Sequence, residues 1–488
     1  MGIQKLIVPN RGEIAVRIAR ACREMGIVSV LGHADSDDIR FTRRFFDESI
    51  SLGDSYLNVA NVIDAAKRAG ADALHPGYGF LSERAELAAA CEEAGIVFVG
   101  PRSKSISAMG SKADSRHLMQ AHGVPVVPGY DGEDQALETL TAEGAKIGWP
   151  LLVKASAGGG GKGMKIVRAA SELRAAIESA QREAMKAFGD DRLLLERYIE
   201  EPRHVEFQIF GDTHGNIVHL FERDCSIQRR HQKVVEETPA PRYSEELRQR
   251  MAAAAIAAAR GVEYVNAGTV EFIVTPEGEF YFLEMNTRLQ VEHPVTELVT
   301  GVDLVRAQLD VASGKPLPWT QDELRQRGHA IEVRIYAEDP DDRFLPQSGI
   351  IAAYAEPAGP GIRVDAGVTR GSEIGLKFDP MLSKLIAFAE TREAAIDRLA
   401  RALRDYVILG TKTNVSWLRR VVSHPAFREG LVSTRFIADH EETLKRTVPE
   451  IVPAIAAAIA AAPRKKHVAA GEAKTPSVWE QLGGWGRG

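Results

Sequence analysis

The chain has 488 residues, of which 44% are hydrophobic and 26% charged, a composition typical of a globular protein with two to four structural units. The formal net charge of −6 and the absence of a long basic run before the last residues give no support to nucleic acid as a partner. No apolar stretch approaches about 18 residues and the first residues lack a signal-peptide layout, so we expect no membrane partner.

The three cysteines, Cys22, Cys91 and Cys225, are far apart in the sequence and form no Cys-x-x-Cys pair. This spacing argues against a disulfide framework and against a zinc site. We therefore predict a soluble protein in the reducing cytoplasm.

The first part of the chain alternates strand and helix patterns. Strand patterns at residues 5–8, 27–31, 71–74 and 96–99 are separated by segments with helical spacing of apolar residues. Because strand–helix–strand units place their strands in parallel, residues 1–110 are predicted to form a doubly wound parallel-sheet domain of the α/β class.

Beyond this domain the pattern changes. Paired strands and hairpins predict an α+β domain over residues 111–310, and a third domain is predicted over residues 328–436. Residues 437–488 contain an Ala-rich stretch and a Gly- and Trp-containing end, so we expect a helix followed by a flexible tail.

A glycine-rich loop, Ala157–Gly163, lies in the second domain. It formally satisfies the dinucleotide fingerprint, but residues 164–168 alternate like a strand, whereas that fingerprint opens a helix. A Walker loop also fails, because Gly163 stands where Ser or Thr is needed and Ser156 where Gly is needed. What remains is a glycine turn between antiparallel strands, whose amides can close over phosphates beside Lys154. On its own, the segment is equally compatible with a mobile hairpin that binds no ligand.

A pair of acidic residues predicts a metal site. If Glu277 and Gly278 form a two-residue hairpin loop, Glu271 lies directly opposite Glu284. Two opposed carboxylates repel each other unless one is protonated or a cation lies between them. With Asn286 they offer hard oxygen ligands, which Mg²⁺ prefers where it bridges a protein to nucleotide phosphates. A solvated hairpin is the alternative interpretation.

Polar residues continue at alternate positions along this segment. On an extended strand they would share one face: Glu284, Asn286, Arg288, Gln290 and Glu292. The segment 222–233 adds a dense basic patch that suits an anion, with His231 and Lys233 on one face if it is extended. Taken alone, the patch is also typical of a solvated surface, and a lone His204 or His231 is more often structural than catalytic.

Together, these motifs resemble those of biotin carboxylases. The segments that carry the resemblance are Asn10–Ala15, His75–Glu83, the glycine loop, Pro202–Glu206, Glu222–Lys233 and Glu284–Pro294. The resemblance spans residues 1–436 and implies the ATP-grasp fold, with the glycine loop on a mobile lid at about 126–200 and a biotin carboxylase C-terminal domain over 328–436. It implies an ATP-dependent ligase that converts bicarbonate to carboxyphosphate and carboxylates biotin.

The resemblance also implies roles for individual residues. The ATP-binding residues would be Lys112, Lys154, Gly158, Gly159, Gly160, Gly161, Met164, Glu196, Ile199, His204, Gln228, His231, Glu271 and Glu284. Glu271, Glu284 and Asn286 would hold Mg²⁺ or Mn²⁺. Bicarbonate and biotin would contact Lys233, Arg288, Gln290, Val291, Arg334 and Tyr78. Glu292 would be the general base that deprotonates bicarbonate, Lys233 and Arg288 would hold the anion, and Arg334 would stabilise the enolate-like biotin.

Some positions depart from the family pattern. Pro9 replaces an alanine, Ser111 an aspartate and Pro380 the serine of some relatives, but none of these replaces a proposed chemical group. Residues 40–46 are more aromatic than expected, which puts a subunit contact in doubt. We therefore expect activity to survive these departures, whereas assembly could differ.

The segment Ala184–Lys186 imitates the Ala-Met-Lys of a biotin acceptor, but it lies in the helix-like stretch 172–188, whereas a carrier lysine needs a hairpin tip. We therefore expect biotin on a separate carrier protein or domain as the substrate, with a carboxyltransferase subunit as a further partner and a homodimer as the assembly. The final acceptor would be an acyl-CoA of the acetyl-CoA or propionyl-CoA type, or pyruvate. The alternatives are another ATP-grasp carboxylate ligase and a nucleotide-binding scaffold subunit without turnover.

Overall fold

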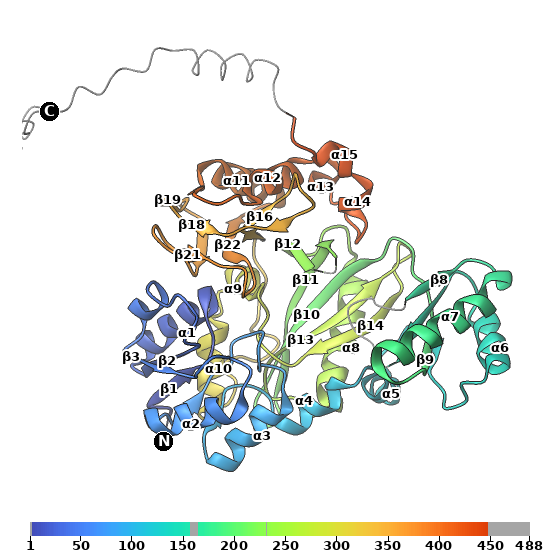
Figure 1. Ribbon diagram of the computed structural model, residues 1–488, viewed down its shortest axis with the longest axis horizontal. Coiled ribbons are helices and arrows are strands. Elements are labelled where there is room, and N and C mark those ends of the chain that lie inside the picture. Colours follow the sequence, from blue (N-terminus) through green and yellow to red (C-terminus); the bar gives the residue numbers. More distant parts are fainter. Residues whose placement is uncertain (1, 157–163, 231, 448–488) are drawn as a thin grey trace, which may run out of the picture. The chain divides into compact units, whose positions relative to one another are not determined.

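The computed structural model describes residues 2–156, 164–230 and 232–447, apart from the side chains of Lys112, Ala113 and Phe188 (Figure 1). The glycine loop, His231 and the predicted tail from residue 448 onward lie outside the described residues. Residues Met1–Leu444 form one unit and Lys445–Gly488 a second. In the part of the chain that is described, no helix combines the length and the apolar character needed to cross a membrane.

The N-terminal sheet is parallel, as predicted. Its strands follow the order β3 (Glu48–Ser51), β2 (Val28–His33), β1 (Lys5–Val8), β4 (Ala73–Leu74) and β5 (Val97–Phe98), and every neighbouring pair is parallel. Helices connect the strands: α1 (Gly12–Met25), α2 (Val59–Ala69) and α3 (Ala85–Ala94). Strand β3 was not predicted, because its residues are at most half-buried and carry no apolar run.

Helix α1 begins inside the segment that the sequence indicated as a loop. Gly12, with a φ of 64°, is its first residue, and Glu13 is buried in its first turn. Just before the helix, the side chain of Asn10 donates to the carbonyls of Pro76 (2.7 Å) and Tyr78 (2.9 Å). This contact joins the start of α1 to the turn that carries Tyr78.

A second sheet runs from the α+β part of the chain into the C-terminal part (Figure 1). Its order is β14 (Phe280–Asn286), β13 (Asn266–Val274), β10 (Arg203–Gly211), β11 (Ile217–Arg229), β12 (Gln232–Thr238), β15 (His329–Tyr336), β22 (Met381–Ala389) and β20 (Ile362–Ala366). All of these pairs are antiparallel, and β12 joins β15 with Val235 opposite Val333. We call it the central sheet. It continues across residues 310–328, where the sequence pattern changes, and the predicted domain limits stay predictions.

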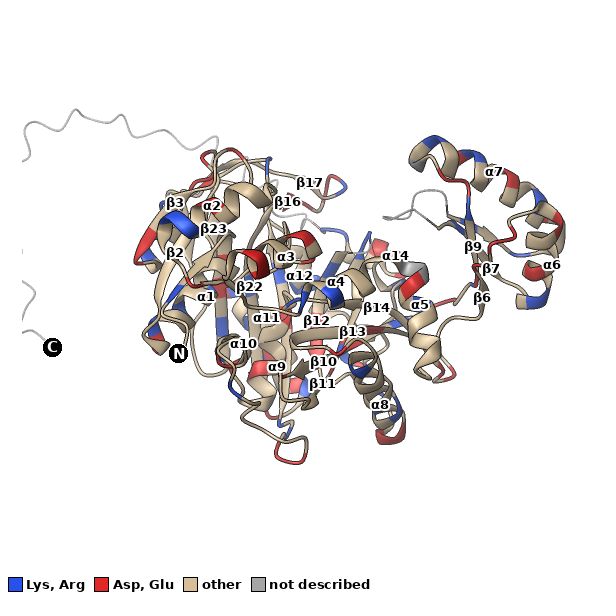
Figure 2. Cartoon of the chain, turned by 90° about the horizontal axis from the view of Figure 1, so that it is seen from below, with Lys and Arg blue, Asp and Glu red and all other residues tan. Residues whose placement is uncertain are grey.

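A smaller sheet carries the strands on either side of the glycine loop. Its order is β6 (Gly129–Tyr130), β9 (Leu193–Arg197), β7 (Leu151–Ala155) and β8 (Lys165–Val167). Alternate residues of β7 are buried against α6 (Leu137–Ile147) and α7 (Ala170–Phe188). The biotin-acceptor look-alike Ala184–Lys186 lies within α7, as predicted. Figure 2 shows both signs of charge interspersed along these two helices.

Further elements complete the description. The helices are η1 (Thr42–Phe45), α4 (Ser103–Gly110), α5 (Lys112–Ala121), α8 (Glu245–Gly261), α9 (His293–Thr300), α10 (Leu304–Ala312), α11 (Arg392–Asp405), α12 (Val415–Ser423), α13 (Pro425–Arg428), α14 (Phe436–Asp439) and α15 (Glu441–Leu444). Short strands are β16 (Glu338–Asp339), β17 (Leu345–Pro346), β18 (Gly349–Ile350), β19 (Ala353–Ala355), β21 (Glu373–Ile374) and β23 (Val407–Leu409). Helix α8 covers β10 and β13, whereas α11 and α12 cover β15 and β22 with apolar side chains. The departure at Ser111 has a structural role, because its hydroxyl caps α5 by accepting from the Asp114 amide (3.3 Å), as an aspartate would.

Candidate active site

The two predicted metal-binding glutamates face each other. Glu271 of β13 lies opposite Glu284 of β14, as predicted, but the hairpin differs from the one assumed. Val274 pairs with Phe280, so the connection is Thr275–Glu279 rather than a two-residue loop. The register then shifts by one residue before Glu284. This β-bulge compensates for the longer turn and restores the pairing.

The predicted strand face through Glu292 is wrong as a strand. Strand β14 ends at Asn286, residues 287–292 form a loop, and α9 begins directly after Glu292. The loop nevertheless keeps the polar side chains together. Arg288 donates to the oxygens of Asn286 (2.9 Å) and Gln290 (2.9 Å), and Gln290 donates to Glu271 (3.2 Å). Hydrogen bonds, and not the alternation of a strand, therefore bring these residues to one place.

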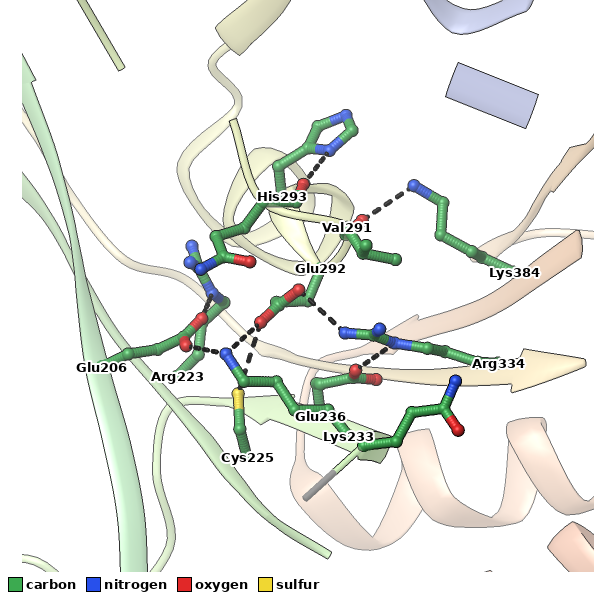
Figure 3. Close-up of polar contacts among 12 residues, drawn as sticks. Glu206, Arg223, Cys225, Lys233, Glu236, Val291, Glu292, His293, Arg334 and Lys384 are labelled. Carbon is green, nitrogen blue, oxygen red and sulfur yellow. Dashed lines mark hydrogen bonds and ion pairs between the residues drawn. The ribbon is translucent and has the colours of Figure 1, made fainter. Parts of the chain in front are cut away.

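Lys233 of β12 is the centre of the site. Its ammonium contacts the carboxylates of Glu206, Glu271 (2.7 Å) and Glu292 (2.7 Å), and its side chain is 12% exposed (Figure 3). Burial disfavours the charged form of Lys233, but the three carboxylates outweigh burial and raise its pKa well above the ordinary value. The site thus holds a fixed positive charge at physiological pH.

Glu292 is fully buried between two cations. One oxygen accepts from Lys233, the other accepts from Arg334 (3.0 Å), and the Cys225 thiol lies 3.8 Å away (Figure 3). Burial favours the neutral form of Glu292, but Lys233, Arg334 and Arg223 outweigh it, so its pKa is held well below the ordinary value. Glu292 is therefore ionised and able to accept a proton.

Three buried charged residues of this cluster were missed by the sequence reasoning. Arg223 is fully buried and binds Glu206 (2.6 Å), and Arg334 binds Glu236 (2.6 Å). The pKa of Glu236 is raised to about 7, because burial and the charge of Glu292 outweigh the attraction of Arg334. Glu206 and Arg223 stand within two of the motifs quoted above, and that membership was the one available signal.

The predicted ATP-binding residues lie on two different sheets. On the central sheet, His204 lies 2.7 Å from Glu271 and is bonded to Gln228. Burial opposes protonation of His204, but the charge of Glu271 outweighs it and raises the pKa of the ring. On the smaller sheet, Lys154 of β7 pairs with Glu196 of β9.

The remaining predicted nucleotide-binding residues are placed as follows. Met164 is exposed at the start of the strand that follows the glycine loop, and Ile199 is half-buried just after β9. The glycines Gly158–Gly161 and His231 lie outside the described residues, as does the side chain of Lys112.

Two other predicted contacts belong to the surroundings of the site. The carbonyl of Val291 accepts from Lys384 (2.8 Å), and Arg288 pairs with Glu83 (2.9 Å), which follows the Tyr78 turn. Tyr78 itself is half-buried against the N-terminal core. These contacts link the loop 287–292 to the N-terminal sheet domain.

The donor set fits a divalent metal. Glu271, Glu284 and Asn286 offer two carboxylates and a carboxamide oxygen from adjacent strands, which are the hard ligands that Mg²⁺ prefers. Glu271 also accepts from Asn286 (2.8 Å) and Lys233 (2.7 Å), so a bound cation competes with these donors.

Comparison with known proteins agrees with this geometry. Three family models match consecutive parts of the chain: the biotin carboxylase N-terminal domain over residues 2–106, the carbamoyl-phosphate synthase L chain ATP binding domain over 111–320, and the biotin carboxylase C-terminal domain over 332–439. The fold and the site thus define an ATP-grasp enzyme.

Two curated relatives and one solved structure are similar over most of the chain. The chain is 49% identical over 90% of its length to the biotin carboxylase of Halalkalibacterium halodurans, of which it covers 98%. It is 48% identical over 99% of its length to the mitochondrial methylcrotonoyl-CoA carboxylase subunit alpha of Dictyostelium discoideum, of which it covers 70%. The biotin carboxylase domain of Hydrogenobacter thermophilus 2-oxoglutarate carboxylase, solved as a dimer with MgADP, ADP and bicarbonate, superimposes with a TM-score of 0.85 at 45% identity, over 92% of this chain and 100% of that one.

The chain belongs to the biotin carboxylase family, which confirms the resemblance and the fold class predicted from sequence. It spans less than two thirds of the methylcrotonoyl-CoA carboxylase alpha subunits of other organisms, for example 63% of that of Rattus norvegicus and 61% of that of Glycine max.

Proposed function

We propose that this chain uses ATP and bicarbonate to carboxylate biotin on a separate carrier protein. The observation that carries the proposal is Glu292, a buried and ionised carboxylate held between Lys233 (2.7 Å) and Arg334 (3.0 Å). A proton acceptor between two cations is what bicarbonate needs, because this weak nucleophile has to lose a proton and approach a negatively charged phosphate. The related Hydrogenobacter domain, solved with bicarbonate and MgADP, supports the proposal.

Bicarbonate would be held by Lys233 and Arg288, with Gln290 and the backbone of Val291 beside it. When the anion takes a share of Lys233, the charge compensation of Glu292 falls and its basicity rises. Glu292 would then accept the proton of bicarbonate, and the anion would attack the terminal phosphate of ATP to give carboxyphosphate and ADP.

Arg334 would act in the second step. Its guanidinium is buried and has a raised pKa, because Glu236 and Glu292 outweigh the cost of burial. A permanent cation at this position would stabilise the negative charge that develops on the ureido oxygen of biotin as its nitrogen attacks the CO₂ released from carboxyphosphate. Tyr78 would lie beside the biotin.

The nucleotide would lie between the two sheets' ATP-binding residues. Lys154 would exchange Glu196 for a phosphate, while His204, Gln228, Ile199 and Met164 would contact the rest of ATP. Glu271, Glu284 and Asn286 would hold Mg²⁺ or Mn²⁺, which when bound offsets the charge of the phosphates.

The proposed partners follow from the same reaction. Ala184–Lys186 is helical, so among the described residues this look-alike is no carrier site, and a separate biotin carrier has to present the substrate. A carboxyltransferase subunit would consume carboxybiotin, and the dimer of the Hydrogenobacter domain supports a homodimer. The relatives named for methylcrotonoyl-CoA and for pyruvate support an acyl-CoA or pyruvate as the final acceptor. Capture of the native partner and cell fractionation would decide the acceptor and test the cytoplasmic location against a mitochondrial one.

The proposal is tested by measuring ADP release from the purified chain with ATP, Mg²⁺, bicarbonate and free biotin. ADP release is expected to depend on bicarbonate and to rise with biotin, and labelled bicarbonate is expected to become attached to biotin. ADP release by the folded protein without bicarbonate, but with an amine acceptor, would instead indicate another ATP-grasp ligase. ATP binding without any turnover would indicate a nucleotide-binding scaffold.

A further inference from the structure

A row of charged residues crosses the central sheet next to Glu292. Lys384 of β22 lies directly opposite Arg334 of β15 on one side and directly opposite Asp365 of β20 on the other. Directly opposed residues of neighbouring strands project from the same face of a sheet. Because Arg334 binds Glu292, this is the face that supports the candidate active site, and Lys384 stands one strand further from the proton acceptor.

Lys384 is completely buried and reaches three other parts of the chain. Its ammonium donates to the carbonyl of Val291 (2.8 Å) and lies 3.2 Å from Glu13 of α1 and 3.9 Å from Asp365. An ammonium is withdrawn from water at a large cost unless partners compensate its charge. Asp365 also pairs with Arg363 (2.7 Å), which leaves Glu13 as the less engaged carboxylate beside Lys384.

Side chains hold the end of the loop that carries Glu292. Strand β14 ends at Asn286, so residues 287–292 have no strand ladder to fix them. His293 donates from its Nδ1 to the carbonyl of Gln290 (2.8 Å), and Lys384 donates to the carbonyl of Val291 (Figure 3). Both carbonyls that precede Glu292 are therefore held by side chains, one from α9 and one from the central sheet.

We propose that Lys384 is a positioning residue for the carboxylation reaction. It acts through the Val291 carbonyl, which it holds so that the neighbouring Glu292 carboxylate reaches bicarbonate while staying between its two cations. Lys384 itself contacts neither bicarbonate nor ATP in this proposal. The inference rests on the proposed function, in which Glu292 accepts the proton of bicarbonate.

Three variants separate the hydrogen bond from the charge of Lys384. Lys384→Met keeps the length of the side chain but removes the donor and the charge. Glu13→Gln is the matched control, because it removes the ionic partner and leaves the donor to Val291 in place. The double variant Glu13→Gln/Lys384→Met removes both charges, so no buried carboxylate of α1 is left beside an uncharged side chain.

The variants are compared by bicarbonate-dependent ADP release and by hydrogen exchange of the amides of residues 287–295. Lys384→Met is expected to lower kcat/KM for bicarbonate by about tenfold or more, the effect of one lost hydrogen bond from a charged donor, without changing KM for ATP. The double variant is expected to be as impaired as Lys384→Met, and Glu13→Gln to match the wild type. Exchange is expected to be faster in the two variants that lack Lys384 and nowhere else in the chain.

Two results would overturn the inference. If the double variant recovered the wild-type kcat/KM, the defect of Lys384→Met would come from the unpaired charge of Glu13 and not from the lost bond to Val291. If hydrogen exchange in residues 287–295 were the same in all proteins, Lys384 would not hold the loop. A wild-type protein without bicarbonate-dependent ADP release would refute the proposed function alone, since the exchange comparison still decides whether Lys384 holds the loop.

Discussion

Replacing Glu292 by glutamine tests the centre of the site with the smallest change in shape. The substitution removes one negative charge and the proton acceptor, but leaves the size of the side chain almost unchanged. Lys233 would keep Glu206 and Glu271 as partners, and Arg334 would keep Glu236. The variant therefore creates no unpaired buried cation, and the protein is expected to fold.

The expected magnitudes differ for catalysis and for stability. Loss of a positioned general base lowers kcat by about 10²-fold to 10⁴-fold. The carboxamide can accept from one of the two cations but turns its NH₂ toward the other, so one charged hydrogen bond is lost at a cost of about 1–3 kcal/mol. The pKa of Glu236 should also fall below about 7, because the charge of Glu292 is one of the causes that raise it.

The assay is bicarbonate-dependent ADP release in the presence of biotin, with ATP binding and urea unfolding measured on the same samples. Glu246→Gln, the same substitution at an exposed position of α8, is the control and should behave as the wild type. Wild-type turnover by the Glu292→Gln protein would show that another group removes the proton. In that case the low pKa of Glu292 would have a structural role only.

Three further predictions concern the metal, the buried charges and pH. Glu284→Ala should raise the Mg²⁺ concentration needed for half-maximal ATP cleavage by about tenfold, the effect of losing one charged ligand, and an unchanged Mg²⁺ titration would contradict the proposed metal ligands. Arg223→Met should lower the free energy of unfolding in urea by about 3–5 kcal/mol, because it leaves Glu206 and the surrounding polar groups in a dry interior with one cation fewer, and a loss below about 1 kcal/mol would count against this. The pKa of Glu13 is raised to about 7, chiefly by burial, so its contribution to stability is present at low pH and is lost as the pH rises through that value. Glu13→Gln should therefore match the wild type in Tm near pH 5 and exceed it near pH 9, and parallel Tm profiles would refute the assignment.

The sequence predicted the pairing of Glu271 with Glu284 for a reason that was only partly correct. Parity along two strands decides which residues share a face, and that parity survived. The assumed two-residue loop did not, because the connection Thr275–Glu279 is longer and a bulge compensates for it. Turn length and bulges depend on how the hairpin packs against the rest of the sheet, which a single sequence does not display.

The position of Glu292 illustrates a missed local signal. Alternating polar residues suggested an extended strand up to this residue, whereas Pro294 in the first turn of α9 marks the start of a helix. The alternation was real, but it described a loop that hydrogen bonds fold against Glu271. Residue identity was enough to choose the site, and the backbone around it was not predictable from periodicity.

The buried charges were the least predictable part of the site. Patterns in one sequence treat a charged residue as solvated, so Arg223 within the segment 222–233 was assigned to a basic patch, although it is fully buried. Its burial depends on Glu206, which lies on the adjacent strand. Lys384 was missed for the same reason, because its partners lie on α1, on β20 and in the loop before α9. Only the strand register brings such residues together.

The continuous central sheet has a practical consequence for dividing the chain. A fragment that ended near residue 320, between two of the matched family regions, would lose β15, β22 and β20 and leave the edge of β12 open. A fragment that began near residue 330 would open the matching edge of β15. Both edges would present rows of unpaired backbone groups that promote aggregation. Chimeras between relatives should therefore exchange β12 and β15 together, with their crossover points in loops outside this pair.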